Sequence, residues 1–319
     1  MPTLVYVEHH EGEAQKPSLG VLSKAAQLDE EVAAVLCGAD VGAIAAGVGK
    51  FGASRVLVAD DPALASPLPQ PRVDVLERVV RDRGFDTVLF GASVLTADVA
   101  AGLAARLGAG LNWDLIDLER SDGRLVGKRA ALGDSLLVDV GWRGEPRLAL
   151  VRSGTFEPIA HGGEADVEAV PVAIDEWSRA TAMLEQAHEE QAGPSIEDAD
   201  VVVAGGRGLG SPDRFALLEE LARALGGAVA ATRAVVDAGW YPYAAQVGQT
   251  GRTVSPRLYL ACGISGAIQH KVGMQSSGTI VAINKDPNAP IFEYCDLAVV
   301  GDLHEIVPRL TELVRERRA

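Results

Sequence analysis

Residues 200–226, DVVVAGGRGLGSPDRFALLEELARALG, join a short apolar run to a helical pattern through a turn rich in glycine. The run VVVA is typical of a buried strand, and the apolar residues spaced three and four apart from Phe215 to Leu225 predict the buried face of a helix. Between them, Gly205–Gly210 has the composition of a tight strand-to-helix turn. The stretch therefore predicts an α/β fold built on parallel strands.

The same alternation of strand and helix patterns continues on both sides of this stretch. Further strand patterns are LVYVEH (4–9), AAVLCG (33–38), RVLVAD (55–60), DTVLFGA (86–92), RLYLACG (257–263), TIVAINK (279–285) and DLAVVGD (296–302). We therefore predict two domains, each with a mostly parallel sheet flanked by helices, and a Rossmann-like C-terminal domain. We expect LLVDVGW (136–142) and RLALVRSGTF (147–156) to be antiparallel because no helix separates them.

The domain boundary is predicted in the polar segment 175–200, which lacks strand signals. The chain of 319 residues exceeds the usual size of one domain, and we assign 1–190 to an N-terminal, partner-facing structural domain and 197–319 to a C-terminal domain. His188 lies in the boundary segment and is interpreted as a solvated linker residue.

Charge and cysteine content exclude several classes of protein. Residues 197–319 carry 14 acidic and 12 basic residues, so nearly all of the formal net charge of −15 belongs to the first 196 residues. An acidic chain without a basic block is a poor candidate for binding nucleic acid. Three scattered cysteines predict neither a disulfide framework nor a zinc site, and we assign no metal.

The sequence favours a cytoplasmic protein that does not insert into a membrane. No apolar run approaches the roughly 20 residues that a membrane helix requires. The N-terminus MPTLVYVEHHEGE is acidic, the opposite of an Arg-rich, acid-poor presequence.

Three turns in the C-terminal half are candidates for ligand binding. Gly205–Gly210 brings backbone N–H groups and Arg207 to the end of a strand, although such turns also serve only tight packing. The second is Leu258–His270, LYLACGISGAIQH, where we expect a strand, the GISG turn and then a helix. Ser265 and the amides that follow it would be directed at one spot beyond the end of the strand. A lone histidine such as His270 is more often a structural residue with its own hydrogen-bond partners. The third, Gln246–Gly251, offers two side-chain amides and a hydroxyl for hydrogen bonds to the edge of a planar heterocycle, and its alternative is an ordinary turn.

Polar residues follow the predicted strands at the positions where open α/β sheets deliver ligand contacts. They are Arg233, Asn284, Asp286 and Asp302. Asp302 also stands where it would cap the final helix, and both roles are compatible.

Five motifs resemble the FAD domain of the electron-transfer flavoprotein alpha subunit. They are GGRG (205–208), TRAVVDAG (232–239), QVGQTG (246–251), GISGAIQH (263–270) and IVAINKDPNAPIFEYCDLAVVGDL (280–303). The match is dense over 200–310. Residues 1–160 are similar more loosely, as in VLVADD and LVRSGTFE.

The resemblance implies a set of FAD contacts. Around the pyrophosphate it implies Arg207, Ser265, Gly266, Ala267, Ile268 and Gln269. At the adenosine end it implies Asn284, Asp302 and Leu303, and along the ring and ribityl region Val247, Gly248, Gln249 and Thr250. Arg233 would lie over the isoalloxazine and His270 near its N1/C2 carbonyl edge, while Thr232 stands where many relatives have serine.

The resemblance also implies a function. Arg233, His270 and Thr250 would tune the flavin, because cations and hydrogen-bond donors favour its reduced form. We expect an electron carrier rather than an enzyme, paired with a beta subunit that binds AMP or a second FAD. Donors would be flavoprotein dehydrogenases such as the acyl-CoA dehydrogenases of fatty acid beta-oxidation, and the acceptor a quinone oxidoreductase. The alternatives are an NAD-dependent enzyme and a non-redox nucleotide-binding scaffold.

Overall fold

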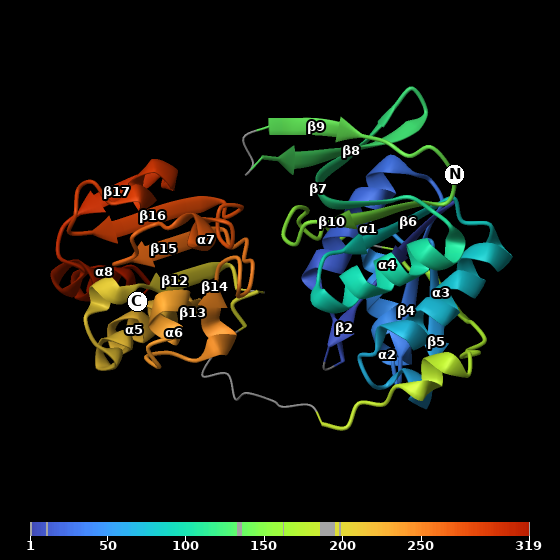
Figure 1. The fold of residues 1–319 in the computed structure, drawn as a ribbon, viewed down its shortest axis with the longest axis horizontal. Coiled ribbons are helices and arrows are strands. Elements are labelled where there is room, and N and C mark those ends of the chain that lie inside the picture. Colours follow the sequence, from blue (N-terminus) through green and yellow to red (C-terminus); the bar gives the residue numbers. More distant parts are fainter. Residues whose placement is uncertain are drawn as a thin grey trace. The chain divides into compact units, whose positions relative to one another are not determined.

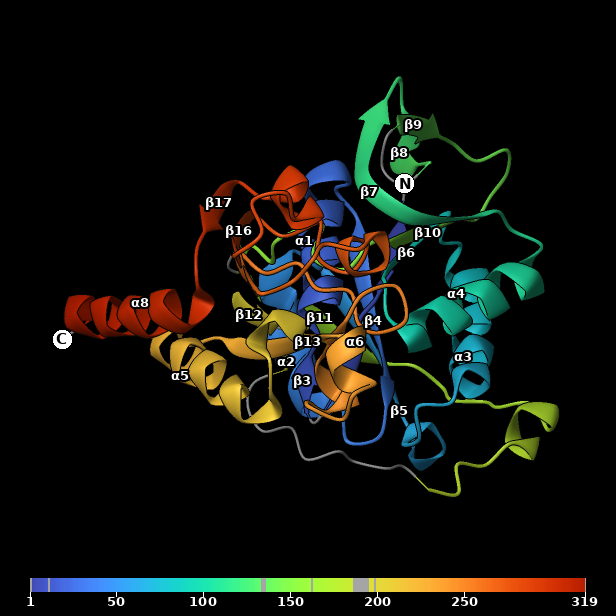
Figure 2. The same ribbon diagram turned by 60° about the vertical axis from the view of Figure 1, so that its left-hand side comes forward.

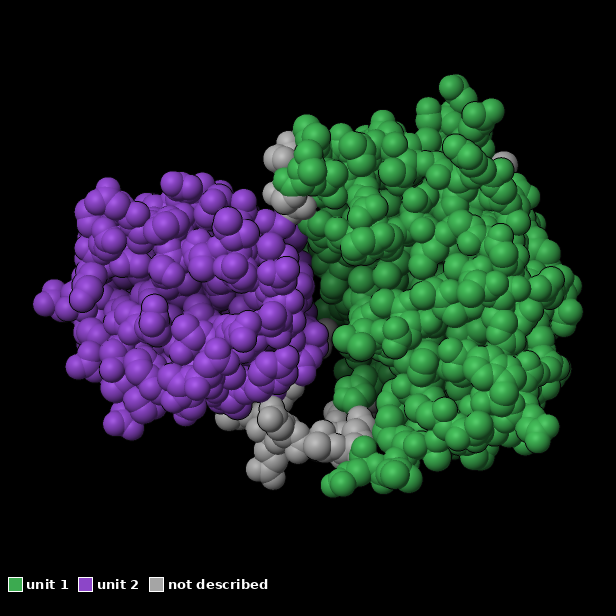
Figure 3. Space-filling model, in the orientation of Figure 1, with its two compact units in different colours: residues 1–186 green, residues 187–319 purple. Residues whose placement is uncertain are grey.

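The chain folds into two compact units, Met1–Gln186 and Ala187–Ala319 (Figure 3). The computed structural model describes residues 2–10, 12–132, 136–161, 163–185, 195–197 and 199–318. The division between the units falls inside the segment 175–200. The predicted limit at 190 and the linker residue His188 lie outside the described residues, so the domain limits and the role of His188 stay predictions.

A large sheet forms the centre of the first unit (Figure 1). In the described part of the chain it has nine strands, in the order β11-β5-β4-β1-β6-β10-β7-β8-β9. The strands from β11 to β7 are parallel: β11 (Asp166–Ala169), β5 (Arg55–Asp60), β4 (Val32–Gly38), β1 (Thr3–Tyr6), β6 (Thr87–Gly91), β10 (Arg147–Val151) and β7 (Leu111–Ser121).

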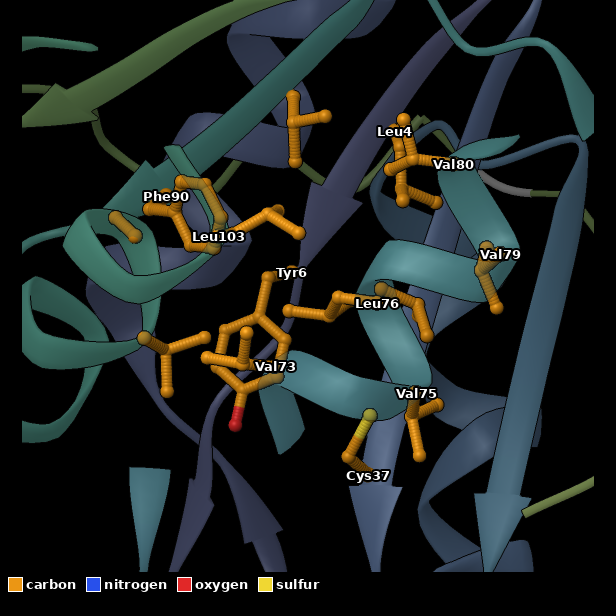
Figure 4. Close-up of a cluster of buried hydrophobic side chains, with 14 of the residues drawn as sticks. Leu4, Tyr6, Cys37, Val73, Val75, Leu76, Val79, Val80, Phe90 and Leu103 are labelled. Carbon is orange, nitrogen blue, oxygen red and sulfur yellow. The ribbon is translucent and has the colours of Figure 1, made fainter. Parts of the chain in front are cut away.

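Helices cover both faces of this sheet because side chains on a strand alternate between its two sides. Leu4 and Tyr6 of β1 face α3 (Pro69–Arg83) and α4 (Val94–Leu107). Val5 and Val7 face the other way, toward α1 (Lys16–Leu28) and α2 (Gly42–Val48). Figure 4 shows the first of these cores, where Val73 and Leu76 of α3 and Leu103 of α4 close around Tyr6 and Phe90.

An antiparallel extension continues the sheet beyond β7. Strand β8 (Arg124–Ala131) pairs antiparallel with β7, and β9 (Leu136–Val140) pairs antiparallel with β8. Strand β9 forms the edge of the sheet, and Leu136, Leu137 and Val138 on it are exposed. A separate small hairpin joins β2 (His9–His10) to β3 (Glu13–Ala14).

The antiparallel arrangement expected for residues 147–156 is wrong. Strand β10 lies between β6 and β7 and runs parallel to both. Strand β9, in residues 136–142, is antiparallel, but to β8 and not to β10. The local rule failed because β10 pairs with the distant β6 instead of turning back on its neighbour in sequence.

The second unit contains an entirely parallel sheet. In the described part of the chain it has six strands, in the order β14-β13-β12-β15-β16-β17. They are β12 (Val201–Gly205), β13 (Ala228–Thr232), β14 (Gln246–Val247), β15 (Leu258–Cys262), β16 (Thr279–Asn284) and β17 (Leu297–Val300). Numbered along the chain, this is the order 3-2-1-4-5-6 of dinucleotide-binding folds, with the switch point between β12 and β15.

The two faces of the second sheet are covered differently. On one face α5 (Phe215–Leu225) and α8 (Leu303–Arg318) lie side by side over Val203 and Leu260 (Figures 1 and 2). On the other face no long helix is present among the described residues, and the strands pack against Val254, Met274 and Ile291 of the connecting segments. The remaining helices, α6 (Arg233–Val236) and α7 (Ile268–Lys271), are single short turns.

Short 3₁₀ turns complete the described secondary structure. They are Gly49–Phe51, Pro62–Leu64, Trp177–Ala180, Arg207–Leu209, Pro212–Arg214, Tyr243–Ala245 and Pro290–Tyr294. The predicted α/β class with two mostly parallel, helix-flanked sheets is confirmed. Among the described residues, no helix combines the length and the apolar character needed to cross a bilayer.

The core of the first unit predicts a clear difference between buried and exposed leucines. Leu103 is fully buried, so Leu103→Ala is expected to lower the free energy of unfolding by about 2–5 kcal/mol. Leu184 is 97% exposed, so Leu184→Ala should change it by no more than about 0.5 kcal/mol. Urea unfolding followed by tryptophan fluorescence measures both, and equal effects would contradict the assigned core.

Candidate functional site

The candidate residues gather at one edge of the sheet in the second unit. All six strands are parallel, so their carboxyl ends meet at the same edge. Arg207 follows β12, Thr232 ends β13 and Asn284 ends β16. The turns 248–251 and 263–267 and the pair Asp302–Leu303 follow the other strands. The topology therefore assembles the predicted positions on one side of the fold.

Two glycine-rich turns lie backbone against backbone at the switch point. The N–H of Gly206 donates to the carbonyl of Cys262 at 3.0 Å, and the N–H of Gly208 donates to the carbonyl of Gly263 at 3.0 Å. A Cβ on Gly206 would lie 2.3 Å from the Gly263 oxygen, and one on Gly208 would lie 2.6 Å from the Gly263 Cα. These glycines therefore allow the two turns to pack tightly, which is the role that the sequence offered as the alternative to phosphate binding. The side chain of Arg207 between them is exposed and can face a ligand.

The second turn carries backbone N–H groups that are not used by the fold. Within the described residues, those of Ser265, Gly266 and Ala267 donate no hydrogen bond. Gly266 has a φ of +89°, and a Cβ there would lie 2.3 Å from the amide nitrogen of Ile291, so the turn requires glycine. Successive unpaired amides around a left-handed residue form an anion-binding concavity.

The helix expected after this turn is present, but it is short. It is the single turn α7, and its side chains Ile268 and Gln269 are exposed. A helix of one turn has a negligible dipole, since the dipole is the sum of many aligned peptides. Attraction for an anion at this turn therefore depends on the loop amides themselves.

Hydrogen bonds tie the turn 246–251 to α7. The N–H of Gln249 donates to the carbonyl of Gln269 at 2.7 Å. Strand β14 in turn pairs with β13, where Thr232 lies opposite Val247. These contacts bring the two predicted ring-side segments together with the end of β13.

His270 is a buried, neutral histidine with both ring nitrogens occupied. The residue is 6% exposed, and Nδ1 lies 3.0 Å from the carbonyl of Val247 while Nε2 lies 2.9 Å from the hydroxyl of Tyr259. Since the carbonyl only accepts, Nδ1 donates and Nε2 accepts from the tyrosine. Burial lowers the pKa of His270 to about 4. The structure thus gives His270 the structural role that a lone histidine usually has, and its place at a flavin edge stays a prediction.

Gln246 begins the third candidate turn, but it is not among the FAD contacts that the family resemblance implies. It is 1% exposed, and its Nε2 donates to the carbonyl of Thr250 at 3.0 Å and to the Thr250 hydroxyl at 3.2 Å. Its Oε1 is buried and lacks a partner among the described residues, at a typical cost of about 1–3 kcal/mol. In the sequence, Gln246 stands as a polar amide between the apolar Ala245 and Val247, which does not reveal that the side chain is buried.

Several predicted contacts already have partners within the protein. Asn284 donates from Nδ2 to the carbonyl of Ile264 at 2.9 Å. The carboxylate of Asp302 accepts from the N–H of His304 at 2.8 Å, which is the helix cap that the sequence suggested as an alternative. Leu303, the first residue of α8, is buried in the core, so its side chain faces away from solvent.

Arg233 stands apart from the other candidates. Its side chain is 64% exposed and pairs with Asp237 one turn later at 3.2 Å. An exposed pair of this kind is weak, at about 0.3–0.5 kcal/mol, so the guanidinium can turn to another partner at little cost.

Comparison with known proteins places this arrangement in a family. The sequence model described as "Electron transfer flavoprotein FAD-binding domain" matches residues 195–275, and the one described as "Electron transfer flavoprotein domain" matches residues 3–175.

Three relatives match almost the whole chain, and each is named electron transfer flavoprotein subunit alpha. The protein of Mycobacterium tuberculosis is 42% identical over 318 residues, covering 99% of this chain and 98% of the relative. The protein of Mycobacterium leprae is 41% identical with the same coverage. The protein of Thermoanaerobacterium thermosaccharolyticum is 38% identical over 320 residues, covering 98% of this chain and 97% of the relative.

Buried His270 predicts a pH dependence of stability. The pKa of His270 is about 4 in the folded protein, whereas an unperturbed histidine, as in the unfolded chain, has a pKa of 6.5. The unfolded chain therefore binds the proton more readily. The contribution of neutral His270 to the free energy of unfolding is fully present above pH 6.5. It is lost as the pH falls from 6.5 to 4, a decrease of roughly 3 kcal/mol.

His270→Gln is expected to remove this component. Urea unfolding at several pH values, followed by Trp240, the one tryptophan of the second unit, measures it. Carboxylates titrate alike in both proteins, so the difference between the two pH curves isolates His270. Parallel curves for the two proteins between pH 6.5 and 4 would contradict a buried, neutral imidazole.

Proposed function

The chain belongs to the electron transfer flavoprotein alpha subunit family, and from this we propose that it is the FAD-holding subunit of a heterodimeric electron carrier. The family consists of electron carriers rather than enzymes. Its FAD-binding domain matches residues 195–275, so FAD is the cofactor. The beta subunit would be the partner in the heterodimer.

The amides of Ser265, Gly266 and Ala267, which donate no hydrogen bond to any described residue, are the observation that carries this proposal. They stand at the switch point of a 3-2-1-4-5-6 sheet, where dinucleotides bind in open α/β folds. A pyrophosphate offers the acceptor oxygens that three such N–H groups need. The donor set therefore fits the phosphate portion of FAD.

The other candidate residues would hold the rest of the cofactor. Arg207, together with the exposed Ile268 and Gln269, would line the approach to the pyrophosphate, and Asn284 with the Asp302–Leu303 backbone would meet the adenosine end. Residues 247–250 would line the ring and ribityl region, with Arg233 over the isoalloxazine and His270 near its N1/C2 carbonyl edge. Thr232, at the end of β13, would also belong to the cofactor site. When bound, FAD supplies the ring system that takes up and releases electrons.

The electron donors and acceptor in this proposal are other redox proteins. Flavoprotein dehydrogenases such as acyl-CoA dehydrogenases would supply electrons, as in fatty acid beta-oxidation, and a quinone-linked oxidoreductase would receive them. The first unit would face the partner, which would carry AMP or a second FAD. A cytoplasmic, reducing location is supported by the three cysteines, all of which are free thiols.

A pair of glycine variants tests the cofactor site. Gly266→Ala places a Cβ against Ile291 and strains the turn, so the copurified heterodimer should lose most of its FAD. Gly84 also has a positive φ, +67°, but a Cβ there meets nothing within 4 Å. Gly84→Ala should keep its FAD and lose only about 1 kcal/mol of stability.

Flavin absorbance per heterodimer, with circular dichroism to check folding, is the measurement. A folded Gly266→Ala heterodimer with full FAD content would contradict the proposed site. A colourless wild-type heterodimer that takes up no added FAD would overturn the function itself.

Arg233 provides a second test, on the potential of the bound flavin. Removing a cation above the ring disfavours its reduced form, so Arg233→Ala should lower the one-electron potential by about 59 mV for a contribution of about 1.4 kcal/mol, with FAD retained. Arg223→Ala is the matched control, because this arginine lies at the end of α5 away from the carboxyl edge of the sheet. Spectroelectrochemical titration measures both, and equal potentials in wild type and Arg233→Ala would remove Arg233 from the ring.

A further inference from the structure

The side chain of Gln246 is held beneath the turn that follows β14. It is buried, and the turn closes over it so tightly that a Cβ on Gly251 would lie 2.3 Å from the Gln246 carbonyl oxygen and 2.9 Å from its Cγ. From there Nε2 reaches both the carbonyl of Thr250, at 3.0 Å, and the hydroxyl of Thr250, at 3.2 Å. The amide therefore contacts Thr250 at two atoms.

The chemistry of these atoms fixes which way each proton points. A carbonyl oxygen only accepts, so the NH₂ end of the Gln246 amide must face Thr250. The same NH₂ group donates to Oγ1 of Thr250 and occupies one of its lone pairs. The hydroxyl proton of Thr250 is consequently directed away from Gln246.

The bond to the hydroxyl is the one that Gln246 alone supplies. The hydroxyl of Tyr243 also donates to the Thr250 carbonyl, at 2.9 Å, so that carbonyl keeps a donor without Gln246. Meanwhile Oε1 of Gln246 stays buried without a partner in the described part of the chain. An apolar side chain of the same length would avoid this unpaired acceptor, so what the amide contributes is its donor to Oγ1.

We propose that Gln246 is a positioning residue that commits the Thr250 hydroxyl to donate a hydrogen bond to the cofactor's ring. This inference rests on the proposed function, in which residues 247–250 border the ring. A donor aimed at a site where negative charge develops stabilises the reduced form without reorganising first. Gln246 acts through Thr250 and does not itself touch the cofactor.

The test is Gln246→Met in the heterodimer copurified with its beta subunit. Methionine fills the same space, removes the donor to Oγ1 and also removes the unpaired acceptor, so folding and FAD content should be retained. The equilibrium constant for one-electron reduction should fall by about tenfold, which is about 59 mV in potential. Spectroelectrochemical titration gives the potential, and flavin absorbance gives the FAD content.

A double-mutant cycle separates positioning from simple packing. Thr250→Val removes the hydroxyl, so adding Gln246→Met to it should lower the potential no further. Tyr243→Phe is the matched control, since it removes the other bond to the Thr250 carbonyl and leaves the hydroxyl bond intact. It should leave the potential unchanged.

Three results would overturn the inference. The first is that Gln246→Met leaves the potential unchanged. The second is that Gln246→Met lowers the potential equally in the wild type and in Thr250→Val. The third is that Tyr243→Phe lowers the potential as much as Gln246→Met does. A wild-type heterodimer that binds no FAD would instead overturn the proposed function, and this inference with it. If the wild-type heterodimer binds FAD and Gln246→Met has the same potential as the wild type, only this inference is overturned and the proposed function is unaffected.

Discussion

The close approach of two glycine turns at the switch point is the constraint on which the second unit depends. Gly206 and Gly208 donate to the backbone of Cys262 and Gly263, and no side chain fits between the two turns. This packing uses the amides of Gly206 and Gly208 in the first turn. Within the described residues, the three successive amides of the second turn, from Ser265 to Ala267, donate no hydrogen bond, and they are available to a ligand at this edge.

The parts of this architecture that depend on local pattern could be predicted from the sequence. Apolar runs such as VVVA and the spacing of apolar residues from Phe215 to Leu225 specify buried strands and an amphipathic helix, and parallel strands bring their carboxyl ends to one edge. Pairing between distant segments is not encoded locally. For that reason the direction of β10 was predicted wrongly, and the β7–β8 hairpin was not anticipated.

Side-chain partners within the candidate site were equally hidden from the sequence. The ring nitrogens of His270 bind Val247 and Tyr259, and the carboxylate of Asp302 caps α8. The unpaired oxygen of Gln246 appears only when the turn 248–251 closes over it. Whether a polar group finds a hydrogen-bond partner depends on which segments of the chain lie together in the fold. The sequence shows only which residues follow each strand. The cofactor contacts of these residues remain predictions.

The exposed edge strand β9 has a consequence for handling the protein. An edge strand carries a row of unpaired backbone groups, and in β9 these are accompanied by exposed Leu136, Leu137 and Val138. Apolar side chains beside an open strand edge form a template for pairing with another extended chain, including a second copy of the same one. We therefore expect a partner or segment that covers β9 to lower the tendency of the isolated chain to associate with itself through this edge.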